Sequence, residues 1–539
     1  MNHPFTTRLP LPFPATEPRH ARPGPQSGEP AEAAPPGDAA PDEPQQRAAR
    51  GPKLSQADIL LHLGMDEYHL VRHDQTAYAV PVAGPPIARP LRANGGFSGT
   101  GSLRQLLNRS YVLATGRAPS QGCLTDAIAS MDALALDAEE RPVCLRIAAD
   151  PADAQATWLD LGRSDGLSVL IEPGTWSVTT PPVGEGPLWR RTNLTGELPV
   201  PERDPGGWRA GLGLLRELSA LAEPSWRMAV AWLLAGLRPD MPRPIGYLNG
   251  ERGTAKTTTA RQVLRVLDGM GAEVRSVPRS EDDAMVTASA GWTMGLDNLA
   301  GIPQWLSDFL CRASTGAAVA KREMYTDGDV TSWAYKRPVL LTAIDVGALQ
   351  ADLGDRLLPL TMEAIDPKAR RSEHDLWRRY RAAHGRILGG LIDLAAAVWA
   401  RLPDADQLTR KPRMADWAEM LWALDAVTGW DTLDTYTRAQ HSVTDDVIDA
   451  DPVATALTRW SATATTTQWQ ATAAQIDEVL RPPGAIPDDW PKTTARLSAR
   501  LTSLAPVLRQ HGIDIRKLQR TSVTRGFLIT RHPDSGPPA

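Results

Sequence analysis

A loop near the middle of the chain carries the residue types that bind phosphate. Residues 250–257 read Gly-Glu-Arg-Gly-Thr-Ala-Lys-Thr, close to the pattern G-x-x-x-x-G-K-S/T. In such loops successive backbone N–H groups surround the phosphates, and the following helix directs its positive end at them. Lys256 would reach the β- and γ-phosphates and Thr257 would hold Mg²⁺. The pattern predicts a nucleoside triphosphate site, expected to take ATP, whose contacts are Gly250, Glu251, Arg252, Gly253, Thr254, Ala255, Lys256, Thr257 and Thr258.

Ala255 stands where the pattern has glycine. Alanine is the smallest residue after glycine and tolerates a helical backbone, so we expect it to fit at the start of the helix, with Gly253 supplying the turn. The flanks agree, because residues 244–248 predict a strand and residues 258–267 an amphipathic helix. The alternative is a glycine-rich turn with an incidental lysine.

A carboxylate follows a second apolar run. Residues 291–298 end in Leu-Asp-Asn, and an acid at a strand end can hold the water shell of Mg²⁺. We expect Asp297 to bind the metal with Thr257; the alternative is that Asp297 caps a later helix. Asn298 fills the place of a second acid and can position a water but cannot take its proton. The water-activating residue stays open among Glu281, Asp282 and Asp283.

Two further groups could sense or stabilise the γ-phosphate. Thr342 ends the predicted strand 338–343, although an ordinary strand-end threonine is an equal alternative. Arg356 lies between a helix end and another apolar strand in residues 352–360. An arginine there can project at the γ-phosphate of a neighbouring subunit. The alternative is a surface ion pair of Asp355 with Arg356.

Composition places the chain among intracellular globular proteins. Its 539 residues are 42% hydrophobic with a net charge of -5, enough for several cores. No apolar run of membrane-spanning length and no secretory signal occur, so we expect a cytoplasmic protein without a membrane partner. The three cysteines have no metal-ligand spacing.

The element pattern predicts an α/β fold with a parallel sheet flanked by helices. Short strands between residues 141 and 180 indicate a small α+β domain before it, and amphipathic helices follow it. The expected divisions are a disordered Pro/Ala-rich tail (1–53), an α+β domain of unknown role (54–200), a helical linker (201–240), the ATPase core (241–365), a helical lid (366–445) and a winged-helix-like basic domain (446–539).

The C-terminal end is basic within an acidic protein. Nine Lys or Arg residues lie between Lys492 and Arg531 against one acid, Asp514. A long helix followed by two β-like runs suggests a winged helix, which would contact DNA phosphates. The alternatives are a solvated face or a protein-docking module. The expected contacts are Arg496, Arg500, Arg516, Lys517, Arg520 and Arg525.

With these residues placed, the stretch 245–430 resembles the superfamily 3 and D5-like helicase ATPases of phages, plasmids and integrated elements, a branch of the AAA+ proteins. The shared phrases are residues 250–257, residues 296–308, residues 322–327, Arg337-Pro338-Val339, Asp355-Arg356 and residues 412–416. The resemblance implies a ring, commonly a homo-hexamer, with ATP between subunits and single-stranded DNA in a central channel. Duplex DNA would be bound by the winged helix.

The resemblance also assigns roles. Lys256 and Thr257 become the phosphate-loop pair, Asp297 the Walker B acid, Thr342 the first sensor and Arg356 the arginine finger. Arg413 in the lid becomes the candidate second sensor. A pore-lining hairpin is implied near residues 320–322, and its DNA contacts would be Lys321, Arg322, Tyr325 and Lys336.

Thr342 departs from the asparagine common at the sensor, and Asn298 from the second acid. Both departures bear on the rate of hydrolysis rather than on nucleotide binding. The sequence therefore predicts an ATP-driven DNA translocase or helicase that acts in replication of a mobile element. One alternative is a nucleotide-switched initiator that binds DNA without unwinding it, which Asn298 favours. Another is a defence or regulatory ATPase.

Overall fold

The computed structural model describes most of the chain after Lys53. The described ranges are residues 54–91, 101–182, 184–271, 273–316, 319–322, 330–333, 336–343, 351–366, 368, 370–409, 411–484, 486–487, 489–518 and 526–532. The predicted tail, residues 1–53, lies outside them. None of the helices in these ranges combines the length and the apolar character that a membrane span requires.

The first folded part is a small helix-and-sheet unit with its own core. Serine caps start each of its three α-helices, with Ser55, Ser102 and Ser120 accepting a bond from a first-turn N–H group. Four strands form a sheet in the order β3-β2-β1-β4. Its elements are α1 (Gln56–Glu67), β1 (Tyr68–His73), β2 (Thr76–Pro81), β3 (Arg89–Pro90), α2 (Leu103–Thr115), α3 (Gln121–Leu134), η1 (Ala135–Asp137) and β4 (Glu139–Glu140).

The strands predicted between residues 141 and 180 form an antiparallel meander, β6-β7-β8-β9, beside a small pair, β10-β5. The run expected at 143–147 is broken in two by a bend at residues 145–146. Apolar side chains of the meander share one core with helices that follow residue 200. A boundary at 200 therefore does not coincide with a break in packing. The strands are β5 (Val143–Cys144), β6 (Ile147–Ala149), β7 (Thr157–Asp160), β8 (Ser168–Glu172), β9 (Thr175–Thr179) and β10 (Leu188–Trp189).

A five-stranded parallel sheet in the order β12-β13-β16-β11-β17 forms the centre of the structure. Alternate residues face different cores, so Leu248 and Tyr247 of one strand belong to separate apolar clusters. Burial of both faces explains why these strands read as apolar runs. The elements are β11 (Ile245–Asn249), α6 (Lys256–Asp268), β12 (Val274–Arg275), α7 (Glu281–Ala290), β13 (Met294–Leu299), α8 (Gln304–Thr315), β14 (Val319–Arg322), β15 (Val330–Trp333), β16 (Val339–Ala343), α9 (Ala351–Gly354) and β17 (Leu357–Thr361).

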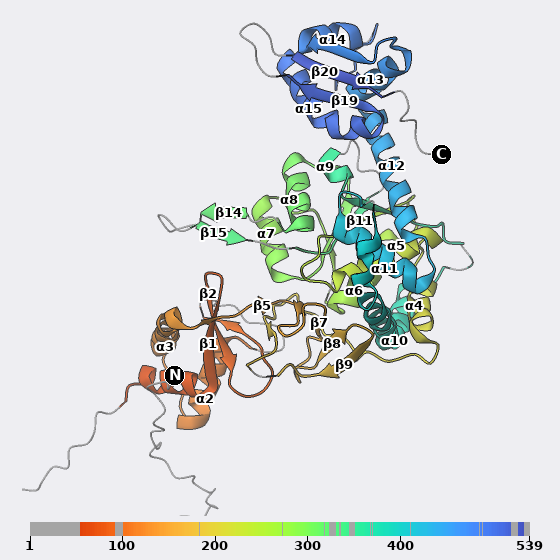
Figure 1. The fold of residues 1–539 in the computed structure, drawn as a ribbon. Coiled ribbons are helices and arrows are strands. Elements are labelled where there is room, and N and C mark those ends of the chain that lie inside the picture. Colours follow the sequence, from red (N-terminus) through yellow and green to blue (C-terminus); the bar gives the residue numbers. More distant parts are fainter. Residues whose placement is uncertain are drawn as a thin grey trace, which may run out of the picture. The chain divides into compact units, whose positions relative to one another are not determined.

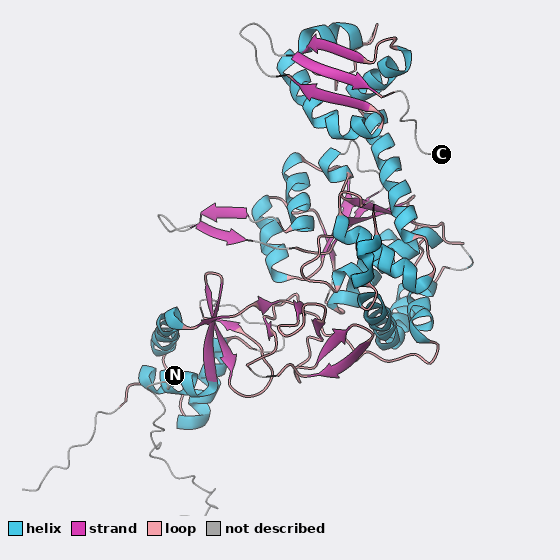
Figure 2. Cartoon of the chain, in the orientation of Figure 1, coloured by secondary structure: helices cyan, strands magenta, loops and turns pink. Residues whose placement is uncertain are grey.

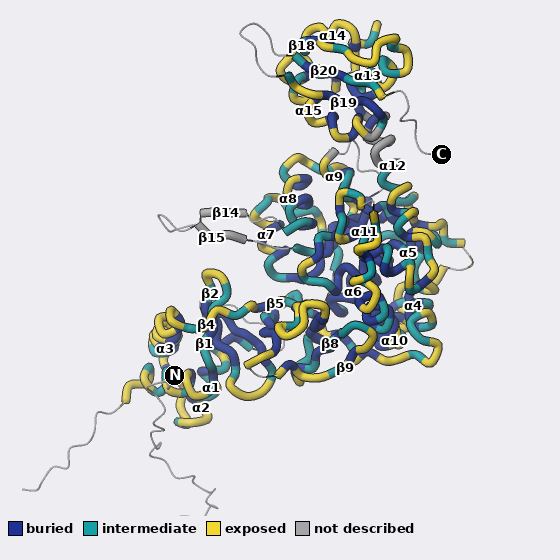
Figure 3. Tube along the Cα trace, in the orientation of Figure 1, coloured by how far each residue is buried: buried dark blue, intermediate teal, exposed yellow. Residues whose placement is uncertain are grey.

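Helices that precede and follow the sheet strands in the sequence complete this core. Pro224 is the second residue of α5, within the first turn, where a helix tolerates proline. α4 and α10 approach closely at glycines, where a Cβ on Gly211 would lie 2.5 Å from the Arg386 carbonyl oxygen. In Figure 3 buried chain follows these helices and the central strands. The helices are α4 (Gly207–Leu218), α5 (Glu223–Gly236), α10 (Glu373–Trp399), η3 (Leu402–Gln407), α11 (Ala415–Thr428) and α12 (Thr432–Ala450).

The C-terminal part alternates helix, strand, helix, helix, strand, strand. Its three strands are antiparallel in the order β18-β20-β19, and Figure 2 shows them together with their helices. They enclose a separate apolar cluster. The elements are α13 (Pro452–Thr463), β18 (Gln468–Thr472), α14 (Ala473–Leu480), α15 (Thr494–Gln510), β19 (Ile513–Lys517) and β20 (Gly526–Arg531).

Candidate nucleotide site and nucleic-acid surfaces

The candidate phosphate loop lies at a strand-to-helix junction. β11 ends at Asn249 and α6 begins at Lys256, with residues 250–255 between them. Within this described loop and helix, no side chain caps the start of α6. The N–H groups of its first turn can therefore bind an anion, and the helix dipole favours one there.

The prediction that Ala255 has a helical backbone is wrong. Ala255 has φ 60° and ψ 31°, the left-handed conformation, and Gly253 has φ 82°. The chain must turn sharply just before the helix, which is the reason the pattern has glycine at that position. An alanine held there costs about 1–2 kcal/mol. The loop thus holds Ala255 in a backbone conformation that alanine disfavours.

Lys256 folds back over the loop. Its Nζ donates to the carbonyl oxygens of Gly250, at 2.7 Å, and Glu251, at 2.8 Å. Thr254 stiffens the same turn, because its hydroxyl donates to Glu251 O at 2.9 Å. The ammonium group therefore already lies across the loop that would enclose phosphates. Phosphate oxygens would replace the two carbonyl acceptors.

Two hydroxyl side chains, from α6 and β16, converge on the carboxylate of Asp297 on β13. Thr257 donates its hydroxyl proton to Asp297 Oδ1 and Oδ2, at 3.0 and 3.2 Å, and Thr342 donates to Oδ1 at 2.5 Å. The same Thr342 oxygen accepts the Asn298 N–H at 3.0 Å. Asn298 has φ 56°, which this bond helps to hold. Thr342, only 1% exposed, fixes both residues.

The strand order explains this convergence. The strand β16, which carries Thr342, lies between β11 and β13, so the strand of Asp297 is not the immediate neighbour of the loop strand. Asp297 does not cap the helix after Pro303, because the N-cap residue of α8 is Pro303 and no side-chain cap bond is present there. Carboxylate and hydroxyl oxygens are ligands that Mg²⁺ accepts, with water filling its remaining positions. Thr257 and Asp297 therefore fit a magnesium ion.

The candidates for activating water are mostly engaged elsewhere. Glu281 begins α7 and forms an ion pair with Arg312 of α8. Asp283 lies in the same first turn, where its N–H group is capped by Ser280. Asp282 also has an interaction within the chain. The identity of the water-activating residue stays a prediction.

Arg356 lies at the opposite edge of the sheet from the loop. It directly precedes β17, whose Leu357 pairs with Ile245 at the start of β11. The loop follows the other end of β11, roughly 15 Å away at 3.3 Å per residue. Arg356 therefore does not reach Lys256 of its own chain. Its guanidinium contacts Asp352 at 3.4 Å and its side chain is 15% exposed.

Arg413 groups with Arg356 and not with Lys256. Its guanidinium donates to Asp355 at 2.7 Å and to Asp352 at 2.5 Å. Burial pushes the pKa of Asp352 upward, but the bond from Arg413 and the charge of Arg356 outweigh burial and lower it. A contact of Arg413 with the nucleotide of its own loop is therefore not what the structure shows. The alternative ion pair of Arg356 with Asp355 is wrong in its partner, because Arg356 pairs with Asp352, which lies one helical turn before it.

The predicted hairpin is present as a two-stranded antiparallel pair, β14 and β15, labelled in Figure 1. Lys321 and Arg322 lie on β14, where they pair with Thr331 and Val330. Tyr325 lies outside the described residues. Lys336 lies at the base of the hairpin, where its Nζ donates to the Asp240 carbonyl oxygen. The Lys336 ammonium is therefore already bonded within the chain.

The basic C-terminal residues differ in whether their side chains form ion pairs within the chain. Arg500 pairs with Asp451, and Arg516 pairs with Asp514 at 2.6 Å. Arg496 and Lys517 are exposed, with no side-chain partner recorded in the described part of the chain. Arg520 and Arg525 lie outside the described residues. The available positive charge is therefore smaller than the residue count predicts.

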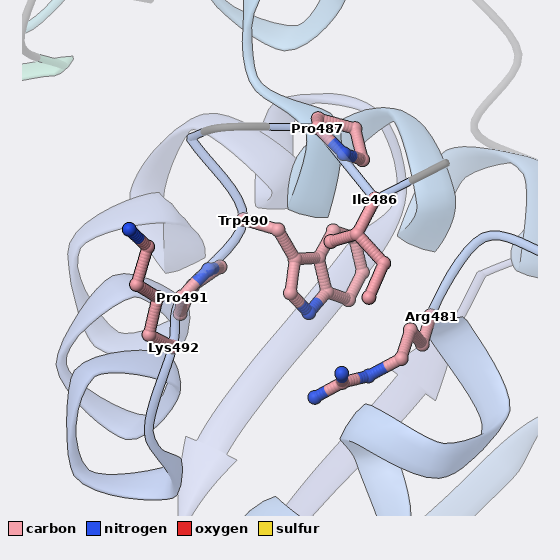
Figure 4. Close-up of a pocket in the computed structure, with 6 residues that line it drawn as sticks. All are labelled: Arg481, Ile486, Pro487, Trp490, Pro491 and Lys492. Carbon is pink, nitrogen blue, oxygen red and sulfur yellow. The ribbon is translucent and has the colours of Figure 1, made fainter. Parts of the chain in front are cut away.

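A pocket of about 350 Å³ lies between α14 and α15 (Figure 4). Arg481 and Lys492 flank it, with Ile486 and two prolines on the wall. Trp490 is 3% exposed and donates its Nε1–H to Asp477 at 2.8 Å. The indole is thus part of the local core and is not free to stack on a base. Of its two cations, Arg481 is ion-paired with Asp477, which leaves Lys492 to add to the basic surface.

The similarity to solved structures is weak. The NrS-1 C-terminal region (305–718) has a TM-score of 0.36 at 9% identity, covering 89% of this chain and 100% of that chain. An active helicase, SCCmec type IV Cch, scores 0.41 at 11% identity, covering 86% and 93%. JCV helicase scores 0.24 at 14% identity, covering 44% and 64%. TM-scores this low do not establish a shared fold. A search of curated proteins finds no match.

Family models give a direct result. Residues 213–448 match the actinomycete integrative conjugative element replication protein, AICE RepA, and residues 453–537 match the AICE RepA C-terminal domain. The two matched segments follow each other in the chain and together span well over half of it. The first contains the phosphate loop, Asp297, Thr342 and Arg356. The chain therefore belongs to the AICE RepA family, the replication proteins of actinomycete integrative conjugative elements.

Proposed function

We propose that this replication protein is an ATPase that moves along DNA and unwinds it, with residues 250–257 as its phosphate loop. The observation that carries the proposal is the convergence of Lys256, Thr257 and Asp297 at one edge of a parallel sheet, next to an uncapped helix start. Ligands in open α/β sheets bind outside the carboxyl ends of the strands. A triphosphate with Mg²⁺ matches the charges and ligands at this edge.

The domain proposal follows the same elements. The strand order, with β16 between the loop strand and the acidic strand, supports an AAA+ P-loop core over residues 241–365. Helices α10 and α11 support a helical lid over 366–445. Three helices and a three-stranded antiparallel sheet support a winged helix over 446–539. The α+β part, 54–200, has no catalytic motif, and its meander packs with the core.

Each residue has a distinct role in the proposed reaction. The loop N–H groups and the Lys256 ammonium would neutralise the β- and γ-phosphates. Thr257 and Asp297 would hold Mg²⁺, which neutralises charge that develops as the γ-phosphoryl group leaves. Thr342 fixes the Asp297 carboxylate and the Asn298 backbone. Asn298 would orient the attacking water.

Arg356 is proposed to act on a neighbouring subunit. It lies roughly 15 Å from its own loop, so its charge can serve a γ-phosphate only across an interface. Arg413 lies beside it, and its charge is matched by ion pairs with Asp352 and Asp355. We propose a homo-oligomeric ring, a hexamer by resemblance, with ATP between subunits. The hairpin residues Lys321 and Arg322 would contact single-stranded DNA in the channel.

A second candidate function is a nucleotide-switched initiator that binds the origin without unwinding it. Asn298 favours it, because an amide in place of an acid cannot accept a proton from water. The family match favours a replication setting over the defence setting. Both remaining candidates need DNA binding, to which the exposed Arg496 and Lys517 of the C-terminal part could contribute.

Two assays test the proposal. The first measures ATP hydrolysis with and without single-stranded DNA, comparing wild type with Lys256→Ala. Stimulated turnover that is absent in the variant supports the ATPase, and equal turnover in both proteins refutes the loop assignment. The second measures unwinding of a forked duplex. DNA binding and ATP turnover without strand separation would refute the helicase function and favour the initiator function.

A further inference from the structure

Arg146 reaches from the N-terminal part of the chain to the end of the phosphate-loop helix. It lies between β5 and β6 and is 1% exposed. Its guanidinium donates to Asp268 Oδ1 at 3.1 Å from Nε and 3.0 Å from Nη2. Asp268 is the last residue of α6, the helix that begins with Lys256.

The same carboxylate also holds the strand that carries Asp297. Asp268 Oδ2 accepts the backbone N–H and the hydroxyl of Thr293, each at 3.0 Å. Thr293 directly precedes β13. One buried aspartate therefore joins the far end of the loop helix to the near end of the acidic strand. Those two elements deliver Thr257 and Asp297 to the candidate magnesium site.

The segment around residue 196 closes this junction tightly. Arg146 Nη2 donates to Gly196 O at 2.6 Å, and a Cβ on Gly196 would lie 2.5 Å from Asp268 O. Thr192 donates its hydroxyl proton to the carbonyl of Ala290, the last residue of α7, at 2.6 Å. The N-terminal part thus contacts the C-terminal ends of α6 and α7, the two helices that precede β13 in sequence.

A contribution to stability alone does not account for this pair. Burying two charges costs several kcal/mol per ion, and apolar replacements of such pairs are often neutral or stabilising. A second buried pair, Arg191 with Asp160, lies entirely within the N-terminal part, with a 2.7 Å contact and side chains at most 1% exposed. That pair has the same chemistry but does not reach α6.

We infer that Arg146 is a positioning residue of the nucleotide site. By holding Asp268 against Thr293, it fixes α6 relative to β13 and therefore the separation of Thr257 from Asp297. Residues 143–198 are then part of the ATPase machinery and not a separate sensing domain. This inference rests on the proposed function, because it concerns how the same site holds Mg²⁺.

The test measures how much Mg²⁺ strengthens the binding of a fluorescent ADP analogue to the full chain. Removing Arg146 (Arg146→Met) is expected to reduce that Mg²⁺ enhancement on the order of tenfold, as loss of an outer-shell partner does at metal sites. Affinity in EDTA should stay unchanged, because the loop N–H groups and Lys256 are left in place. Arg146→Lys should restore part of the enhancement.

Arg191→Met is the matched control. It should lower thermal stability to a similar extent and leave the Mg²⁺ enhancement at the wild-type value. Equal effects in the two variants, or none in Arg146→Met, overturn the inference. If Arg146→Met does not fold, Thr293→Val, which removes one of the two bonds to Asp268 Oδ2, must reduce the enhancement or the inference fails. Wild type that binds no nucleotide would instead refute the proposed function.

Discussion

Replacing Thr342 by valine removes one hydroxyl from the centre of the candidate site and preserves the shape of the side chain. The hydroxyl donates to Asp297 Oδ1 at 2.5 Å and accepts the Asn298 N–H at 3.0 Å. Because Thr342 lies on β16 and is buried, no water replaces it easily. A hydrogen bond to a charged group contributes about 1.5–3 kcal/mol.

If that energy acts in the transition state, Thr342→Val lowers kcat for ATP hydrolysis by about 10- to 150-fold, at about 1.4 kcal/mol per tenfold. Binding of ADP should change little, because Thr342 has no recorded contact with the phosphate loop. Thr342→Ser keeps the oxygen and should retain most of the wild-type kcat. The assay is steady-state phosphate release, with circular dichroism to check folding. A folded Thr342→Val variant with the wild-type kcat would refute the role of this hydroxyl.

Three further predictions concern the loop, the subunit interface and a buried histidine. Ala255→Gly should bind ADP at least as well as wild type, whereas Ala255→Val should bind more weakly, because φ 60° is less accessible to a β-branched residue than to alanine. Equal affinities of the three proteins in equilibrium titrations would contradict the left-handed turn. Arg356→Ala should retain ADP binding but lose about 10³-fold in kcat. Mixing it with Lys256→Ala protein should restore turnover at interfaces that combine an intact loop with an intact Arg356. Normal turnover by Arg356→Ala alone would refute the role of Arg356 in hydrolysis. Burial lowers the pKa of His384 from 6.5 to about 4, so the folded state favours the neutral ring and loses on the order of 3 kcal/mol of stability as pH falls from 6.5 through 4. Urea unfolding of wild type and His384→Gln checks this, and an identical pH dependence in both would contradict it.

Local patterns were enough to predict much of the core. The strands at residues 245–249, 294–299 and 339–343 read as apolar runs because both faces of a parallel sheet are buried. The helices of 207–236, 373–399 and 415–428 repeat apolar residues at helical spacing. The α/β class with a parallel sheet is therefore confirmed.

Features set by tertiary contacts were beyond the sequence. Strand order depends on pairing between distant segments, so the place of β16 beside Asp297 could not be predicted from spacing. The pairing of Arg500 with Asp451 and the location of Arg413 beside Asp352 have the same origin. The boundary expected at residue 200 overlooked the core that the meander shares with later helices. The left-handed backbone of Ala255 is imposed by the turn of the loop, because alanine itself does not favour that conformation.

Equilibrium binding of Mg-ATP to the full chain tests the central claim most directly. Isothermal titration of wild type, Lys256→Met and, as a surface control, Lys517→Met separates loop binding from general charge effects. The account predicts one saturable site per chain in wild type and in Lys517→Met, and a large loss of affinity in Lys256→Met, because that ammonium group lies across the loop. Wild type that binds no Mg-ATP, or binds it equally well without the Lys256 amine, would contradict the account.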